Sequence, residues 1–185
     1  MSKRYLASTS LSVALAFATL TVGSSLLGAQ QDGAPTLNDA TIVAIFDNAN
    51  SFDIETGNLA AKQGHSNEVR QFGAMLARDH QMVRQQGRDL ATKLGVTPTP
   101  PAGDKSAEAQ AATLKRLSGL RGAEFDRAFL QHEATFHRDV IAAVKSTLLP
   151  AIKNEELKAL VAQVAPAFQA HLDMAENLNK RLAAK

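Results

Sequence analysis

Two residues in the middle of the chain, Glu133 and His137, have side chains that can bind a metal ion or exchange protons. They are one helical turn apart, so they share one face of any helix formed here. Phe129, Phe136 and Val140 recur around them at helical spacing, which predicts that this face is buried. A carboxylate and an imidazole in an apolar core are costly unless they are paired or hold a metal.

Three more side chains of the same kinds interrupt apolar stripes elsewhere in the chain, namely Asp53, His80 and His171. Each alone would more often be a satisfied core residue than a ligand. Helical bundles, however, build metal sites from inward carboxylates and imidazoles on facing helices. We therefore predict that these three side chains converge with Glu133 and His137 on a metal ion.

Two alternatives stay open at the level of the sequence. Imidazole and carboxylate ligands suit zinc, iron, copper and manganese, and the pattern does not choose among them. The same five side chains could instead form a metal-free network of hydrogen bonds and ion pairs. The other two histidines, His65 and His132, are expected in a turn and on the surface, and Asp79 is expected to be a solvated helix charge.

Four long helices must position these groups, and apolar residues at helical spacing predict them. The predicted ranges are 38–64, 66–94, 123–149 and 154 onwards. Asn38, Ser66 and Asn154 are residues that favour helix starts. The second helix follows the first after two or three residues, which requires an antiparallel hairpin. Pro166 falls inside the last helix and predicts a kink one turn before His171.

The segment between the two pairs of helices differs in composition. Residues 96–103 include Pro98, Pro100 and Pro101 and are predicted to be extended, and a short helix is predicted over 106–117. Together they have the length of a crossover along a bundle. The fold class we predict is all-α, a four-helix bundle with a short extra helix in the crossover. The expected apolar stripe of the first helix consists of Ile42, Ile45, Phe46, Ala49, Phe52, Leu59 and Ala60.

The N-terminal residues predict export. Lys3 and Arg4 precede an apolar run that ends at Leu27-Gly28-Ala29, which is the pattern of a signal peptide cleaved after Ala29. The predicted organisation is a signal peptide over 1–29, a lead-in over 30–37 and a helical domain over 38–185. A cleaved leader would make the protein periplasmic or secreted, whereas an uncleaved one would anchor it in a membrane. No transmembrane segment is predicted after residue 29.

Composition narrows the function classes. Removing Lys3 and Arg4 from the 20 basic residues leaves 18, equal to the 18 acidic ones, so the remaining chain gives no support for a nucleic-acid partner. The chain has no cysteine, which excludes disulfides and a lipoprotein anchor. No nucleophile–base pair or phosphate-binding loop is apparent, so an enzyme is the least favoured of the classes that remain.

Several segments together resemble the domain-of-unknown-function family DUF4142, an exported bacterial family of ferritin-like proteins. The matching segments are Phe52-Asp53-Ile54-Glu55-Thr56-Gly57-Asn58-Leu59-Ala60, Glu68 to Gly73, Met75 to His80, Leu94 to Val96, Phe125 to Phe129 and Pro166 to His171. The resemblance covers nearly all of the chain after the leader and implies a ferritin-like four-helix bundle. It implies no established activity.

The chain departs from the di-iron pattern of ferritin-like proteins, which uses two Glu-x-x-His motifs. Ala77 stands three residues before His80 and Phe168 three residues before His171, so two of the expected carboxylates are missing. A single metal ion, or none, fits better than a dinuclear iron centre. The leading hypothesis is a periplasmic metal-binding bundle. The alternative is a non-catalytic envelope or stress-related module with a metal-free polar core, and a protein partner or homo-oligomer stays open.

Overall fold

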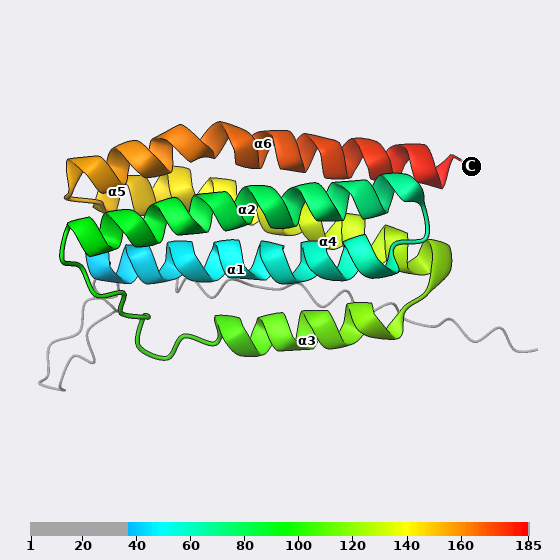
Figure 1. The fold of residues 1–185 in the computed structure, drawn as a ribbon, viewed down its shortest axis with the longest axis horizontal. Coiled ribbons are helices and arrows are strands. Elements are labelled where there is room, and N and C mark those ends of the chain that lie inside the picture. Colours follow the sequence, from blue (N-terminus) through cyan, green and yellow to red (C-terminus); the bar gives the residue numbers. More distant parts are fainter. Residues whose placement is uncertain (1–36, 185) are drawn as a thin grey trace, which may run out of the picture. The chain divides into compact units, whose positions relative to one another are not determined.

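The computed structural model describes residues 37–184, and every regular element within them is helical (Figure 1). The elements are α1 (Asp39–Gln63), α2 (Asn67–Lys93), α3 (Ser106–Gly119), α4 (Gly122–Ala143), the π-helical segment η1 (Val144–Leu148), α5 (Leu149–Ala151) and α6 (Glu155–Ala183). The prediction of an all-α bundle with an extra helix in the crossover is confirmed. The expected signal peptide, residues 1–29, lies outside the described residues, as does the lead-in apart from Leu37.

Side-chain caps fix the starts of three long helices. Asn38 accepts a hydrogen bond from the backbone N–H of Thr41 at 3.0 Å, and Ser66 accepts one from Val69 at 3.1 Å. Asn154 accepts from the first turn of α6, at 3.0 Å. Such caps satisfy backbone donors that have no partner within the helix. The predicted start residues are therefore the observed ones.

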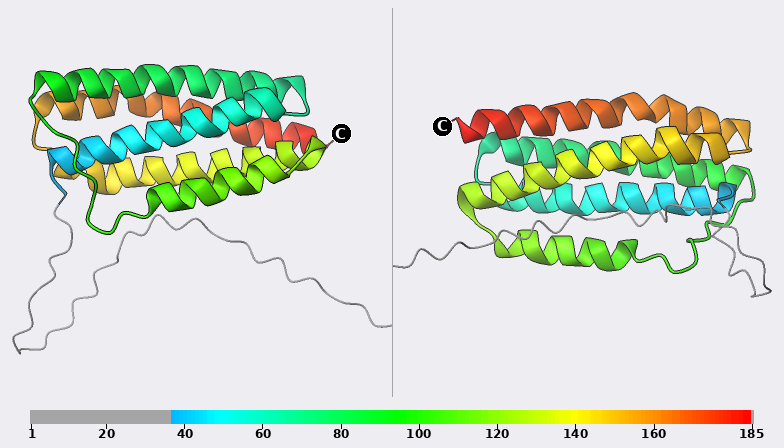
Figure 2. Two further views of the ribbon diagram at one scale, coloured as in Figure 1. Left: turned by 60° about the horizontal axis from the view of Figure 1, so that its bottom comes forward. Right: turned by 180° about the vertical axis from the view of Figure 1, so that it is seen from behind.

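Two antiparallel hairpins form the bundle, α1 with α2 and α4 with α6. After α2, the chain crosses back and α3 runs along α1, so that α4 begins at the end of the bundle where α2 also begins (Figure 2). The side chain of Gln63 holds the end of α3 against α1 by donating to the carbonyls of Leu117 and Leu120, at 3.2 and 2.6 Å. Neighbouring bundle helices are consequently antiparallel throughout.

The α1–α2 hairpin is unusually close because two glycines face each other. A Cβ atom on Gly57 would lie 2.7 Å from the carbonyl oxygen of Gly73, and one on Gly73 would lie 2.6 Å from that of Gly57. Any larger residue would force the two backbones apart. This contact lies one turn beyond Asp53 on α1 and two turns before His80 on α2, so it brings those two side chains within reach.

Two aspartates pin the ends of the hairpins to each other. Asp39 accepts hydrogen bonds from the backbone of Lys153 and Asn154, at 2.9 and 3.0 Å. At the opposite end, the buried Asp126 accepts from the backbone of His65 and Ser66, at 2.7 and 2.8 Å. The axial register of the hairpins is thereby fixed at both ends, and the depth of every inward side chain is fixed with it.

The interior consists of two apolar clusters with a polar layer between them. The first apolar cluster includes Ile42, Phe46, Val144, Leu148, Leu157, Val161 and Phe168. The second includes Val69, Phe72, Leu76, Leu117, Phe125, Phe129 and Leu130. The polar layer consists of Asn50, Asp53, Thr56, His80, Glu133, His137 and His171, all buried. Burial of apolar area provides the main stabilisation on both sides of this layer.

One predicted detail of the helices is wrong. Ala49 and Phe52, expected in the apolar stripe of α1, are only partly buried, and Asn50 is buried together with the expected Asp53. The helix expected to fade at Leu149-Pro150 runs through η1 and α5 and ends at Ala151. Pro166 lies inside α6, which bends in its middle part (Figure 1).

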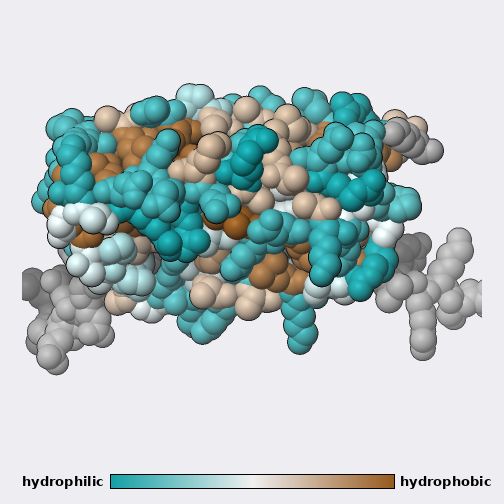
Figure 3. Space-filling view, viewed as in Figure 1, coloured by the Kyte–Doolittle hydropathy of each residue, from teal (hydrophilic) through white to brown (hydrophobic). Residues whose placement is uncertain are grey.

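The surface of the bundle is largely polar. Hydrophobic atoms show through between polar side chains as separate patches on the face in Figure 3. None of the helices within residues 37–184 combines the length and apolarity needed to cross a bilayer.

Candidate metal centre

The structure brings the five predicted side chains together in the polar layer. The ring centroids of His80, His137 and His171 are 5.1 to 5.6 Å apart, and one ring nitrogen of each lies within 4.8 Å of the others. Asp53 and Glu133 form a second group that shares His137. All five residues are at most 5% exposed. They come from four helices, so the site depends on the whole bundle.

The ring nitrogen of His80 that does not face His171 has a defined hydrogen-bond partner. Its Nδ1 lies 2.9 Å from the Oδ1 of Asn50. The amide nitrogen of Asn50 donates to the carbonyl of Phe46 at 2.7 Å, which turns its oxygen towards the imidazole. Because that oxygen can only accept, Nδ1 of His80 is the donor and Nε2 carries the lone pair. The ring of Phe168 stacks on His80, with centroids 5.5 Å apart, and fixes its plane.

The other two imidazoles are oriented in the same way. Nδ1 of His137 lies 3.0 Å from the backbone carbonyl of Glu133, so this nitrogen is the donor and Nε2 keeps its lone pair. Nε2 of His171 lies 3.3 Å from a carboxylate oxygen of Asp79, so here Nδ1 keeps the lone pair. A partner on one ring nitrogen fixes which nitrogen is free to bind a metal.

These assignments turn the lone pairs of His80 and His171 towards each other. Nε2 of His80 and Nδ1 of His171 are 3.2 Å apart, although both are acceptors. Nε2 of His137 has no hydrogen-bond partner within residues 37–184. Two nitrogen ligands of a tetrahedral zinc ion, each about 2.05 Å from it, would be about 3.3 Å apart. The 3.2 Å between the nitrogens of His80 and His171 therefore fits a shared metal ion, and His137 offers a ring nitrogen within 4.8 Å of the other two imidazoles.

The two carboxylates lie behind the imidazoles rather than beside the lone pairs. Asp53 approaches Nδ1 of His80 at 3.4 Å and Nδ1 of His137 at 4.0 Å, and Glu133 approaches Nδ1 of His137 at 3.6 Å. Both Nδ1 atoms are the ring nitrogens that hydrogen-bond to Asn50 or to the Glu133 carbonyl, not the nitrogens that carry the lone pairs. The expected set of five therefore divides into three inward imidazoles and two carboxylates that face their outer sides.

Burial keeps the three imidazoles neutral. It lowers the pKa of His80 to about 2 and that of His137 to about 3, and the charge of a neighbouring imidazole acts in the same direction. The pKa of His171 is also lowered by burial, although its hydrogen bond to Asp79 opposes the change. Neutral imidazole is the form that binds metal ions, so these side chains need not lose a proton first.

Burial has the opposite effect on the two carboxyl groups. It raises the pKa of Glu133 to about 7, while the neighbouring Thr56 hydroxyl and Asp53 carboxyl act against the rise. The pKa of Asp53 is raised well above its ordinary value by burial and by the charge of Glu133. Apart from the Thr56 hydroxyl and the Asp53 carboxyl, the oxygens of Glu133 have no hydrogen-bond partner among the described residues. A nearby positive charge would favour ionisation of both groups.

Two residues that orient the site, Asn50 and Asp79, were not predicted. Asn50 is 1% exposed and occupies the buried stripe one turn before Asp53, a spacing that could have identified it. Asp79 was expected to be solvated, and Arg78 does hold one of its oxygens at 2.8 Å, but its other oxygen faces His171. Of the remaining histidines, His132 is half-buried rather than on the surface, and its ring lies near that of Phe136.

Comparisons with known proteins agree with the fold. The model of DUF4142, a domain of unknown function, matches residues 24–178. No curated protein sequence matches the chain. A DUF305 fragment from Deinococcus radiodurans is 17% identical, with a TM-score of 0.69 over 80% of this chain and 99% of that one. CopM in the Cu(II)-bound form is 14% identical, with a TM-score of 0.61 over 78% of this chain and 98% of that one.

Proposed function

The chain belongs to the DUF4142 family, and we propose that it is an exported helical bundle that binds one transition-metal ion through His80, His137 and His171. Three buried imidazoles from three helices supply the ligands. Asn50, Asp79 and the backbone carbonyl of Glu133 hold the rings in the orientation that binding requires.

One observation carries this proposal, the contact of 3.2 Å between Nε2 of His80 and Nδ1 of His171. A proton between them would form an imidazolium, which the lowered pKa values of both groups disfavour. If His171 instead carried its proton on Nδ1, its Nε2 lone pair would face the Asp79 carboxylate. Both of these metal-free arrangements leave an unfavourable contact, whereas a cation between the two nitrogens satisfies both nitrogens.

Copper(II) and zinc(II) are the ions that the ligands favour. Imidazole suits both, and no thiolate is available because the chain lacks cysteine. One structural neighbour, CopM, was solved in a Cu(II)-bound form, which is consistent with this choice but concerns that protein. Iron and manganese would prefer the carboxylates as direct ligands, and these lie on the outer side of the imidazoles. Asp53 and Glu133 would instead balance the charge of the ion.

The proposed location rests on the leader. The Lys3–Arg4 start and the Ala29 exit support export and cleavage, which would place residues 30–185 in the periplasm or outside the cell. Intact-mass analysis of periplasmic material checks this location. Recovery of the full-length chain in the membrane fraction would show instead that the leader is an anchor.

The test of metal binding compares single-histidine variants with matched controls. Tag-free protein, purified without chelator, is titrated with Zn(II) and Cu(II) by calorimetry, and its metal content is measured after gel filtration. We expect one ion per chain in the parent. We expect His80→Ala, His137→Ala and His171→Ala each to lose this bound ion.

His65→Ala is the matched control, because that residue lies in the turn between α1 and α2, and it should bind like the parent. Equal binding by the parent and all three variants would refute the proposal. No binding by any of them would favour the metal-free polar core, the alternative that the sequence leaves open. Circular dichroism of each variant checks that the helices remain formed.

A further inference from the structure

A groove of about 670 Å³ lies between α2 and α6 and is lined by side chains of both helices. Met75 and Phe72 line it from α2, and Met174 and Leu178 line it from α6. We propose that Met75 and Met174 form a second metal site in this groove, accessible from solvent and selective for a soft monovalent cation such as Cu(I) or Ag(I). This site goes beyond the buried imidazole site and uses none of its ligands.

The two methionines lie at the same level of the bundle. The contact of 3.3 Å between Asp79 and His171 fixes the register of α2 and α6. Met75 precedes Asp79 by one helical turn, and Met174 follows His171 by three residues. Because the two helices are antiparallel, these steps lead in the same direction along the bundle axis. Met75 and Met174 are therefore both about one helical pitch, about 5.4 Å, further along the axis than the Asp79–His171 pair.

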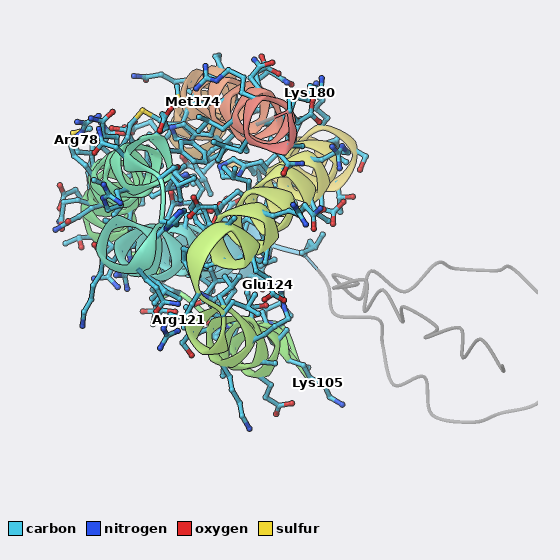
Figure 4. The ribbon with its side chains drawn as sticks, turned by 90° about the vertical axis from the view of Figure 1, so that its right-hand side faces the viewer. Arg78, Lys105, Arg121, Glu124, Met174 and Lys180 are labelled. Carbon is cyan, nitrogen blue, oxygen red and sulfur yellow. The ribbon has the colours of Figure 1, made fainter. Side chains whose placement is uncertain are left out.

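The exposure of Met174 is unusual for a large apolar residue. Among residues 37–184, the large hydrophobic side chains classed as exposed are Met174, at 39%, and Met82, at 55%. Met75 is half-buried, with one side against the second apolar cluster. In Figure 4, Met174 is on the side of α6 that faces α2. A leucine would fill the same space, but only methionine offers a polarisable sulfur to the groove.

The side chains that line the groove determine which metal ion it can bind. Thioether sulfur is a weak ligand for zinc(II) but suits Cu(I), and Ag(I) has the same preference for soft donors. Glu68 and Asp173 also line the groove, with Arg181 as the one cationic residue in the lining. The two metal sites would thus differ in ligand type, although they are close together. The buried site presents nitrogens to a divalent ion, and the groove presents sulfurs to a monovalent one.

The test uses methyl-labelled methionine in the full mature chain. After Zn(II) has been added, Ag(I) is titrated in chloride-free buffer while the methionine methyl signals are followed by NMR. We expect the signals of Met75 and Met174 to shift together and to reach a plateau at one equivalent of Ag(I). Met82 lies on α2 outside the groove lining, so its signal serves as the internal control and should not move.

Variants complete the test. Met75→Leu/Met174→Leu preserves the apolar volume and should weaken Ag(I) binding about ten-fold or more, whereas Met82→Leu should leave it unchanged. Zn(II) binding should be the same in all three proteins, so failure of the groove site and failure of the imidazole site can be told apart. The proposal is wrong if Met82 shifts with the same midpoint, if no methyl signal shifts by about 1 mM Ag(I), or if the double variant binds Ag(I) as tightly as the parent.

Discussion

Phe129 and Glu133 lie one helical turn apart on α4, and both are fully buried, but they have opposite effects on the metal-free protein. Phe129 belongs to the second apolar cluster, where its ring packs against those of Phe72 and Phe125 with centroids 5.9 and 6.1 Å apart. Burying such a side chain stabilises the fold by about 1.5–3 kcal/mol. Glu133 belongs to the polar layer, and apart from the Thr56 hydroxyl and the Asp53 carboxyl its two oxygens have no partner within the described chain.

The difference between these neighbours indicates why the polar layer is present. A buried polar group without a partner costs about 1–3 kcal/mol, so the layer weakens the bundle where an apolar layer would strengthen it. The two apolar clusters on either side must supply the stability that holds it in place. A layer that destabilises the metal-free fold is better explained by a ligand than by packing.

The largest effect is expected in the apolar region. Phe129→Ala removes a fully buried ring and should lower the free energy of unfolding by about 3–5 kcal/mol. Because this loss of stability arises from packing, it should be the same in the presence of Zn(II) and in the presence of a chelator. Urea denaturation followed by circular dichroism measures both values. A cost that depended strongly on metal would show that the cluster and the polar layer are coupled.

A smaller and pH-dependent effect is expected for Glu133→Gln. The folded pKa of Glu133, about 7, lies above its ordinary value of 4.5, so the folded state holds this proton more tightly. The resulting stabilisation is complete below pH 4.5 and is lost as the pH rises through 7. Glutamine does not titrate, so the variant does not lose this stabilisation. In the presence of a chelator, the free energy of unfolding of the variant minus that of the parent should therefore increase by at most about 3 kcal/mol from pH 4 to pH 8.

Urea denaturation at several pH values measures this difference between the two proteins. The histidines are common to both proteins, so their titration largely cancels in the comparison. Asp53 contributes to the difference, because the charge of Glu133 raises its pKa in the parent. A difference that stayed constant with pH would mean that Glu133 has an ordinary pKa and a partner in the folded state.

Removal of the His80 partner should weaken metal binding without a large loss of stability. Asn50→Ala frees the imidazole to rotate and should raise the zinc dissociation constant about ten-fold, at the low end of the usual range for such partners. Asp53, 3.4 Å from the same nitrogen, can replace part of the lost contact. Asn48→Ala, two residues away and outside the polar layer, is the matched control for calorimetry. Equal affinities in the two variants would contradict the orienting role of Asn50.

The smallest effect is expected for Asp79→Asn. Its carboxylate is partly exposed and also contacts Arg78, so solvent and the asparagine oxygen can replace much of its contact with His171. The zinc dissociation constant should rise only about three-fold. A loss as large as that from His171→Ala would mean that Asp79 is itself a ligand.

Much of the fold could be predicted from residue patterns, because helix caps and apolar periodicity are local. Asn38, Ser66 and Asn154 marked the helix starts, and the five polar residues stood out because each interrupted an apolar stripe. The depths of the histidines in the second hairpin were harder to predict. Counted from Pro150, His137 and His171 are 13 and 21 residues away, a mismatch that a turn over residues 150–154 was expected to reduce. The observed turn lies between Ala151 and Glu155, and Asn154 within it is 17 residues from each histidine.

The internal arrangement of the site could not be predicted in the same way. Which nitrogen of His80 faces inwards depends on Asn50, and this contact spans 30 residues of sequence. A rotation of α4 by a fraction of a helical turn would decide whether the Glu133 carboxylate reaches the ion or only the Nδ1 side of His137. Periodicity identifies the face of a helix but does not give the side-chain rotamer or the partner, so the five residues appeared as one group.

The proposed function makes one claim about the site that spectroscopy can decide, namely that three imidazoles and no pair of carboxylates bind the ion. X-ray absorption at the zinc edge of the Zn(II)-loaded, tag-free protein reports the first coordination shell directly. We expect nitrogen ligands at about 2.0–2.1 Å, with the outer-shell scattering of three imidazole rings. A shell dominated by oxygen, with one imidazole or none, would contradict the account. It would place the ion between Asp53 and Glu133 instead.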